Sequence, residues 1–217
     1  MMKRLYLVRH AQTVWNRENR IQGGSDVPLS PFGRQQAERL AACFASCQVR
    51  GVFTSHLLRS RQTAQAIAAG NGHRVTPVID EALAEMHLGA WEGLTPAEVD
   101  ARFEGAYHRW RHAPSTVCIP EAEPLEQFRV RVRRVFEKLL ACSGEGESVV
   151  VSHGGVIAAL LADLLQADYD ALLRRLRLDN AGITALECGN DGPPHVLWVN
   201  VTTHLEALPQ PESAGWC

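Results

Sequence analysis

Short apolar segments alternate with helix-forming segments along most of this 217-residue chain. Strand-like runs cover residues 4–9, 51–54, 75–79 and 148–152, and helical patterns begin near residues 30, 57 and 154. Two further strand-like runs, 182–188 and 195–201, flank a turn-rich segment. Because strands that alternate with helices usually form parallel sheets, this order predicts a three-layer α/β/α sandwich with a mostly parallel central sheet.

Local signals mark where several helices begin. Ser30 precedes Pro31, and Thr95 precedes Pro96 with Glu98 three residues after the cap, which are typical helix starts. Ser55 is expected to cap the helix that follows the strand at 51–54. The clearest helical pattern covers 124–142, where apolar residues lie on one face. Its arginines lie mostly on other faces among glutamates, so we interpret them as a solvated surface.

The chain length suits a single domain covering residues 1–217. Residues 80–124 contain glycines at 89 and 93 and prolines at 114, 120 and 124, and much of this segment has an irregular pattern. We therefore expect residues 80–124 to form an insertion that covers the carboxyl ends of the strands and the active site. Functional sites of such α/β folds lie at that edge of the sheet.

Composition and charge exclude several classes of protein. Hydrophobic residues make up 46% and charged residues 21% of the chain, which excludes disordered, collagen-like and disulfide-scaffold proteins. The 22 basic and 24 acidic residues give a net charge of 22 − 24 = −2. A chain-wide basic surface for nucleic acid or membranes is therefore not expected. Any binding site for an anion must be built locally.

The chain is expected to work in the reducing cytoplasm. The apolar run at 5–8 is too short for a signal peptide, and no stretch reaches the roughly 20 apolar residues of a membrane span. The six cysteines are scattered and form no C-x-x-C pair. Cys43 and Cys47 have helical spacing, and we interpret them as packing on a core face rather than binding metal.

Two histidines stand at the ends of predicted strands. His10 follows Arg9 at the end of the first strand, and His153 ends another and precedes Gly154-Gly155 at a helix start. If the two strands are neighbours, both imidazoles reach one crevice, where a helix N-terminus favours an anion. A single histidine in such a place is more often structural, but the pair favours a functional site.

Arginines near these strand ends indicate that the anion is a phosphate. Arg9 is adjacent to His10, and Arg59 lies at the start of the helix after the second strand. The planar guanidinium of arginine matches phosphate oxygens, and each charge-assisted hydrogen bond contributes roughly 1.5–3 kcal/mol. Arg61 competes with Arg59, but its position two residues later should point it elsewhere around the helix.

Four ordered motifs now carry a family resemblance. They are L-V-R-H-A-Q-T-V-W-N with R-I-Q-G (7–23), S-H-L-L-R-S-R-Q-T-A (55–64), L-A-E-M-H-L-G-A-W-E-G (83–93) and V-V-V-S-H-G-G (149–155). Together they resemble the histidine phosphatase superfamily, in its phosphoglycerate mutase-like branch, over residues 4 to about 205. The segment D-N-A-G-I-T-A-L-E (179–187) also looks like the penultimate strand of phosphatase members. The resemblance implies the phosphoglycerate mutase-like form of the predicted sandwich.

The resemblance also implies roles for particular residues. His10 looks like the nucleophile that accepts the phosphoryl group as a phosphohistidine, and Glu85 looks like the general acid and base. Arg9, Arg59 and His153 look like the phosphate pocket. Further phosphate or substrate contacts are implied or expected for Thr13, Asn16, Gln22, Gly23, His87 and Gly154.

Chemistry supports these roles independently of the resemblance. A neutral imidazole is a competent nucleophile near pH 7, and phosphoryl transfer needs positioning and positive charge. Two arginines and a protonated histidine can supply that charge without a metal. A carboxylic acid must protonate the leaving group. The residues alone leave Glu85, Glu92 and Glu98 as competing acids, and only the motif favours Glu85.

Two departures from the family pattern bear on the site. Ala11 stands where many relatives have glycine, and alanine is small enough for such a motif. The stretch P-E-A-E-P at 120–124 replaces the P-G-G-E-S that phosphatase relatives often carry, although Glu123 keeps its place. The shape and selectivity of this loop are left open.

We expect a phosphomonoesterase that acts through a phosphohistidine on a small phosphorylated metabolite, with no cofactor and no metal. A 2,3-bisphosphoglycerate-dependent mutase is the alternative, but the segment 80–124 is short and its basic residues are balanced by acidic ones. A non-catalytic phospho-ligand domain and a metallohydrolase are further alternatives; His108 and His112 are spaced like metal ligands but lack a glutamate at the base position. Sugar phosphates, phosphoglycerate derivatives, α-ribazole phosphate and phosphoserine remain candidate substrates, and a homodimer is one option for the assembly.

Overall fold

The computed structural model describes residues 3–72, 75–142, 146–189 and 192–208. The strands in these ranges form one sheet in the order β3-β2-β4-β1-β5-β6. Their bounds are β1 Lys3–Arg9, β2 Val49–Thr54, β3 Val78–Ile79, β4 Gly146–Ser152, β5 Ile183–Cys188 and β6 His195–Val201. Strands β3, β2, β4 and β1 pair in parallel, whereas β5 runs antiparallel to both β1 and β6. The predicted, mostly parallel sheet is confirmed.

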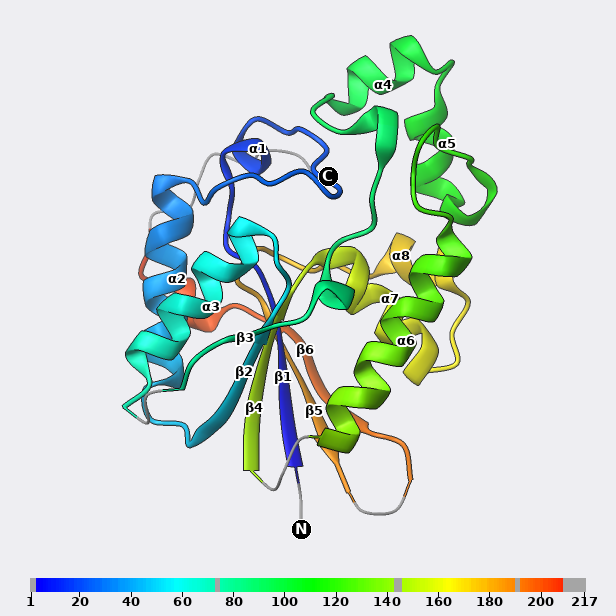
Figure 1. Ribbon diagram of the computed structural model, residues 1–217. Coiled ribbons are helices and arrows are strands. Elements are labelled where there is room, and N and C mark those ends of the chain that lie inside the picture. The colour runs from blue at the N-terminus through cyan, green and yellow to red at the C-terminus, as the bar shows by residue number, and fades with distance from the viewer. Residues whose placement is uncertain (1–2, 73–74, 143–145, 190–191, 209–217) are drawn as a thin grey trace.

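Helices cover both faces of this sheet. Figure 1 shows α2 (Pro31–Phe44) and α3 (Leu58–Gly70) on one face, with α6 (Leu125–Cys142) and α7 (Gly154–Leu164) on the other. The remaining α-helices are α1 Val14–Arg17, α4 Pro96–Arg102, α5 Ala106–His112 and α8 Tyr169–Arg175. Short 3₁₀ helices occupy Glu81–Leu83, Gly89–Trp91, Pro114–Thr116 and Thr203–Leu205. The fold is therefore the predicted three-layer α/β/α sandwich.

Residues 5–8 of the central strand β1 form a continuous apolar run because both faces of this strand are buried. Leu5 and Leu7 pack into the core beneath α6 and α7, whereas Tyr6 and Val8 pack into the core beneath α2 and α3. Side chains of a strand alternate between the two faces, and helices bury both faces here. The strand therefore has no alternation of apolar and polar side chains, which agrees with its position between β4 and β5 in the sheet.

Some helix starts follow their local signals, and one does not. Ser30 accepts a hydrogen bond from Gly33 N, and Thr95 forms a capping box with Glu98. The expectation that Ser55 caps α3 is wrong, because α3 begins after Leu57 without a side-chain cap and the Ser55 hydroxyl contacts His153 instead. A long-range partner has replaced the local one.

Two other sequence-based expectations need correction. The strand predicted at 75–79 is reduced to Val78–Ile79, because only these two residues pair with β2. Cys43 is exposed, and Cys47 lies beyond the end of α2, only partly buried against the core. The two cysteines therefore do not pack together on one core face.

The segment between β3 and α6 lies beyond the carboxyl ends of β1, β2 and β4 (Figure 1). It carries α4 and α5 and has a small core of its own, in which Trp91, Val99 and Tyr107 are buried. This core also includes Ile21, from the loop after β1. The segment thus stands over the edge of the sheet where a site is expected, and its description as an insertion in one domain stays a prediction.

The loop that departs from the family pattern is held by an ion pair. Glu123 accepts two hydrogen bonds from the Arg131 guanidinium, at 2.9 and 2.6 Å. Arg131 also donates to the carbonyls of Ala82 and Ala84 at 2.8 Å. Glu121, which replaces a glycine of the usual pattern, adopts a left-handed φ of 61°. Glu121 therefore adopts a backbone conformation that glycine usually takes. Arg131 links the loop, through Glu123, to the residues that precede Glu85.

Across the described ranges, every helix is too short or too polar to span a lipid bilayer.

Candidate active site

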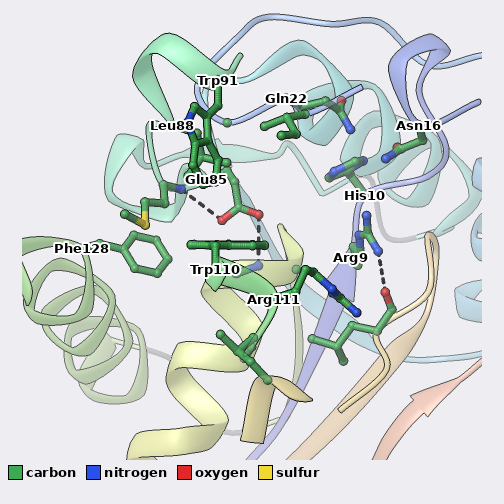
Figure 2. A pocket seen from close by; sticks show the side chains of 18 of the residues that line it. Arg9, His10, Asn16, Gln22, Glu85, Leu88, Trp91, Trp110, Arg111 and Phe128 are labelled. Carbon is green, nitrogen blue, oxygen red and sulfur yellow. Dashed lines mark hydrogen bonds between the residues drawn. The ribbon is translucent and has the colours of Figure 1, made fainter. Parts of the chain in front are cut away.

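Strand register brings the two histidines together. Arg9 and Ser152 are paired residues of β1 and β4, and His10 N donates to Ser152 O at 2.9 Å. His10 and His153, which follow directly, have ring centroids 5.2 Å apart. The condition that the two strands be neighbours is therefore met, and His10 lines a cavity at the carboxyl edge of the sheet (Figure 2).

Side chains from α2 and α3 fix the loop that follows β1. Ala11 N donates to the Thr63 hydroxyl at 3.1 Å, and Gln12 N donates to the side-chain oxygen Oε1 of Gln36 at 2.9 Å. The Ser30 hydroxyl also donates to Gln12 Oε1 at 2.8 Å. All of these groups are buried, so the backbone that directly follows His10 is held in one position.

The hydrogen bond and the charge state of His10 both fit the predicted role of a nucleophile. Its Nδ1 lies 2.8 Å from Ala11 O, and because a carbonyl can only accept, Nδ1 carries the hydrogen. Burial, followed by the nearby Arg59 and Arg9, lowers the pKa of His10 well below its usual value. The imidazole is therefore neutral near pH 7, and its Nε2 keeps a lone pair.

His153 is fully buried and contacts the Ser55 hydroxyl through Nε2 at 2.8 Å. Its Nδ1 has no hydrogen-bond partner among the described residues. Burial and then Arg59 lower the pKa of His153 well below its usual value. Because burial and then Arg59 disfavour the charged ring, the protonated form of His153 is not favoured in this structure. A phosphate dianion beside this ring would oppose that shift.

Arg59 is a cation enclosed by the protein, with only 1% of its surface exposed. Its two terminal nitrogens donate to Ser25 O and Gly23 O at 2.6 and 2.7 Å. Burial lowers its pKa to about 10, so it remains charged at neutral pH. Arg9 donates to Leu178 O and also lines the cavity. Both predicted phosphate-binding arginines therefore reach the histidines.

A hydrogen-bond chain orients the amides of Asn16 and Gln22. Asn16 Oδ1 accepts from Thr13 N and from Asn180 Nδ2, at 3.1 and 3.2 Å. Gln22 Oε1 accepts from the Thr13 hydroxyl at 2.8 Å. With both oxygens engaged, the amide nitrogens of Asn16 and Gln22, which line the cavity, are the groups left to donate to a ligand.

Asn180 also donates to His10 O at 3.0 Å. The sequence alone predicts no role for Asn180, although it lies in the D-N-A-G segment. Thr13 is completely buried and does not line the cavity. Both residues therefore position neighbours rather than face a ligand.

Glu85 is the carboxylate that faces the cavity. Its oxygens accept hydrogen bonds from Met86 N and Gly155 N, each at 3.0 Å. A Cβ atom at position 155 would lie 2.4 Å from Glu85 Oε1, so glycine is required for this close approach. The carboxyl group is thereby held against the N-terminus of α7, on the opposite side of the cavity from Asn16 in Figure 2.

The competing carboxylates have other partners. Glu92 accepts from Gly24 N and Leu88 N at 2.8 Å, and from the Ser25 hydroxyl. Glu98 caps α4 through Thr95. Neither lines the cavity. The structure therefore separates Glu85 from Glu92 and Glu98, which the residues alone could not do.

Of the remaining predicted substrate contacts, the two glycines line the cavity and His87 does not. Gly23 and Gly154 line the cavity, and Gly154 is the first residue of α7. His87 does not line it; its side chain is 58% exposed, its Nδ1 accepts from Gly89 N, and it approaches Glu92 at 3.6 Å. A substrate contact for His87 thus has no support in the geometry.

The wall contributed by α5 was not anticipated. Tyr107, Trp110 and Arg111 line the cavity from this helix, and Phe128 and Tyr169 join them from α6 and α8. The charged side chains on the lining within the described part of the chain are those of Arg9, Arg20, Arg59, Arg111 and Glu85. The cavity is thus strongly cationic although the whole chain has a net charge of −2.

The model of the histidine phosphatase superfamily (branch 1) matches residues 5–201. The chain belongs to this superfamily. The match includes every predicted catalytic position, and the family expectation drawn from the four motifs is confirmed.

Relatives of this histidine phosphatase carry both phosphatase and mutase names. It is 34% identical to the "Putative phosphoserine phosphatase 2" of Hydrogenobacter thermophilus, over 95% of this chain and 100% of the relative. It is also 34% identical to the "Probable phosphoglycerate mutase" of Yersinia enterocolitica, over 86% and 85% of the two chains. A mycobacterial glucosyl-3-phosphoglycerate phosphatase structure superposes with a TM-score of 0.82 at 31% identity, covering 93% of this chain and 100% of the other.

Histidine, cysteine, aspartate and glutamate side chains form no group of three suited to a metal ion within the described ranges. The rings of His108 and His112 lie with centroids 4.6 Å apart at an interplanar angle of 45°, and His112 Nδ1 donates to His108 O. The sequence spacing that suggested metal ligands is therefore that of two neighbouring turns of α5.

Proposed function

We propose that this histidine phosphatase hydrolyses a small phosphomonoester through a phosphohistidine formed on His10. The observation that carries the proposal is the His10 imidazole itself, whose Nδ1 hydrogen is bound by Ala11 O in a cavity containing Arg9 and Arg59. This arrangement leaves Nε2 as the reactive nitrogen. A metal is not needed to supply positive charge, because the arginines already do so.

In the first step, His10 Nε2 attacks phosphorus. The N–P bond forms as the ester P–O bond breaks, and Glu85 gives a proton to the leaving alcohol. Arg9, Arg59, His153 and the amide of Asn16 hold the phosphoryl oxygens while charge shifts among them. Pre-positioned donors of this kind stabilise the transition state without reorganising.

In the second step, a water molecule takes the place of the alcohol. The Glu85 carboxylate removes a proton from that water, whose oxygen attacks phosphorus as the N–P bond breaks. The products are inorganic phosphate and the neutral imidazole with which the cycle began. One carboxyl group therefore acts first as an acid and then as a base.

Hydrolysis, rather than transfer to a second oxygen of the substrate, is favoured by the wall facing Glu85. That wall is formed largely by apolar and aromatic side chains, among them Met86, Trp110 and Phe128. A mutase must also hold the second phosphate of a bisphosphorylated three-carbon intermediate. Beyond Arg9 and Arg59, the described lining offers Arg20, which donates to Gly93 O, and the exposed Arg111. The mutase remains the second candidate because relatives carry that name.

Incubation with 3-phosphoglycerate and a trace of 2,3-bisphosphoglycerate distinguishes the two activities. We expect release of inorganic phosphate without accumulation of 2-phosphoglycerate, and loss of that release in His10→Asn. Rapid formation of 2-phosphoglycerate with little free phosphate would instead establish the mutase. A folded His10→Asn variant that keeps the wild-type rate would exclude His10 as the nucleophile.

The substrate is a small phosphorylated molecule in this proposal. A cytoplasmic location, suggested by the scattered cysteines, stays a prediction. The expected lack of nucleic-acid partners and the option of a homodimer likewise remain predictions from the sequence.

A further inference from the structure

The cavity wall beyond Glu85 is apolar. Met86, Phe128, Leu173 and Leu176 line it together with aromatic side chains of α5 and α8. In Figure 2, Phe128, Leu88 and Trp110 lie on the Glu85 side of the cavity, away from Asn16 and Gln22. Because Glu85 must reach the leaving oxygen, the alcohol part of a bound ester extends toward this wall. A hydroxyl-rich alcohol would lose water there and find few partners.

Trp110 presents an aromatic ring that its neighbours hold in place. Its ring centroid lies 6.2 Å from that of Trp91 at an interplanar angle of 79°, and 5.8 Å from that of Tyr107. Trp91 and Tyr107 are both buried in the small core beneath α4 and α5. A ring fixed in this way offers a flat surface against which a planar, apolar group can pack at low entropic cost.

Arg111 is the one arginine on the cavity lining for which the described residues supply no hydrogen bond or ion pair. Arg20, by contrast, donates to Gly93 O at 2.7 Å and lies 3.6 Å from Glu98. Figure 2 shows the Arg111 guanidinium to the lower right of the Trp110 ring and below Arg9 in that view. A cation placed beside an aromatic wall suits a ligand that is apolar over most of its length and anionic at one end.

Building on the phosphatase function proposed above, we propose that the preferred substrates are phosphomonoesters of aromatic alcohols that also carry a carboxylate. The ring packs on Trp110, and the carboxylate binds Arg111. The phosphoryl group stays with Arg9, Arg59 and His10. Arg111 and Trp110 are thus specificity determinants rather than parts of the reacting centre.

Three esters of primary alcohols test the substrate class while keeping leaving-group basicity similar: n-propyl phosphate, 2-phenylethyl phosphate and 2-(4-carboxyphenyl)ethyl phosphate. We expect kcat/KM to rise by about tenfold or more from propyl to phenylethyl, since added apolar groups in a fitted pocket have effects of this size. The carboxylate should add about a further fivefold, as for a solvent-accessible ion pair. Equal kcat/KM values for all three esters would overturn the inference.

Variants of α5 assign the carboxylate effect to Arg111. Arg111→Gln should bring the ratio of kcat/KM between the carboxylated and uncarboxylated aromatic esters close to one. Arg109→Gln is the matched control, because Arg109 lies on the same helix, is exposed and donates to Glu104 O. It should leave the ratio at the wild-type value. If Arg111→Gln lowers both esters equally and preserves the ratio, Arg111 binds the phosphoryl group and the proposal is wrong.

The same experiment separates this inference from the proposed function. If the wild-type protein hydrolyses all three esters without discrimination, the phosphatase function stands and the substrate class fails. If it hydrolyses none of them, nor p-nitrophenyl phosphate, the proposed function fails and the inference fails with it.

Discussion

Both carboxylate oxygens of Glu85 accept hydrogen bonds from backbone N–H groups at the cavity wall. These bonds come from Met86 and from Gly155 at the start of α7. Glu92 and Glu98 use their oxygens to hold a loop and to cap a helix. Position in the fold, rather than residue type, therefore favours Glu85 as the proposed acid.

Glu85→Gln should separate substrates by the quality of their leaving group. Glutamine keeps the shape of the side chain but cannot give a proton, and general acids typically contribute about 10²–10⁴-fold in rate. We expect a loss of that order in kcat/KM for n-propyl phosphate and a much smaller loss for p-nitrophenyl phosphate, whose leaving group needs no proton. Steady-state kinetics on the two esters measures this difference; equal losses would exclude the acid role.

Residues at strand ends were predictable from the sequence, and residues placed by tertiary packing were not. Thr13 and His87 belong to the motifs and were expected to contact the substrate, but neither lines the cavity. His10, His153 and Arg59 each follow a strand end, and the parallel sheet brings such ends together. Trp110 and Arg111 reach the cavity only because α5 packs against Trp91, a contact that no local pattern reveals.

At the scale of elements, the first turn of α2 packs directly on the loop that follows His10. Gly33 lies in that turn, and a Cβ atom there would lie 1.9 Å from Gln12 O. The helix can approach so closely only because position 33 has no side chain. Sequence reasoning found the cap at Ser30 but not this contact, since it depends on how α2 packs.

Gly33→Ala should therefore disturb both stability and catalysis. Overpacking of this kind typically lowers the free energy of unfolding by about 1–3 kcal/mol, and displacement of Gln12 should lower kcat through the neighbouring His10. Gly72→Ala is the control, because nothing lies within 4 Å of a Cβ at that exposed position. Urea denaturation monitored by circular dichroism measures both variants. A Gly33→Ala protein as stable as wild type would contradict the packing argument.

The Ser55 contact shows the same limit of local reasoning. Its hydroxyl lies where a helix cap is expected, yet it contacts His153, which is 98 residues away in the chain. Capping signals at Ser30 and Thr95 were correct because their partners lie within the same turn. A cap can be predicted from sequence only when no distant group competes for the hydroxyl.

At the scale of the whole molecule, two buried neutral histidines make stability depend on pH. The pKa values of His10 and His153 are lowered well below 6.5, mainly by burial. Below pH 6.5 the unfolded chain takes up protons that the folded chain does not, so stability is greatest above that pH and falls as the pH decreases. Each histidine can contribute a slope of at most about 1.4 kcal/mol per pH unit.

Urea denaturation between pH 7.5 and 5 measures this dependence. We expect the free energy of unfolding to decrease across the range, and the decrease to become shallower in His10→Asn. His195→Asn is the control, because that side chain is exposed on β6 and should leave the slope at its wild-type value. A wild-type protein whose stability is constant over this range would show that the buried histidines take up protons in the folded state.

The central claim is that His10 becomes covalently bonded to phosphorus, and trapping that bond tests it most directly. Glu85→Gln mixed with p-nitrophenyl [³²P]phosphate should form the intermediate readily, because this leaving group needs no acid, and should hydrolyse it slowly, because water lacks its base. Alkaline quenching within milliseconds, digestion and mass spectrometry should then find acid-labile label on the peptide that contains His10, and none in Glu85→Gln combined with His10→Asn. Release of p-nitrophenol with no label on His10, or label on another residue, would contradict the account.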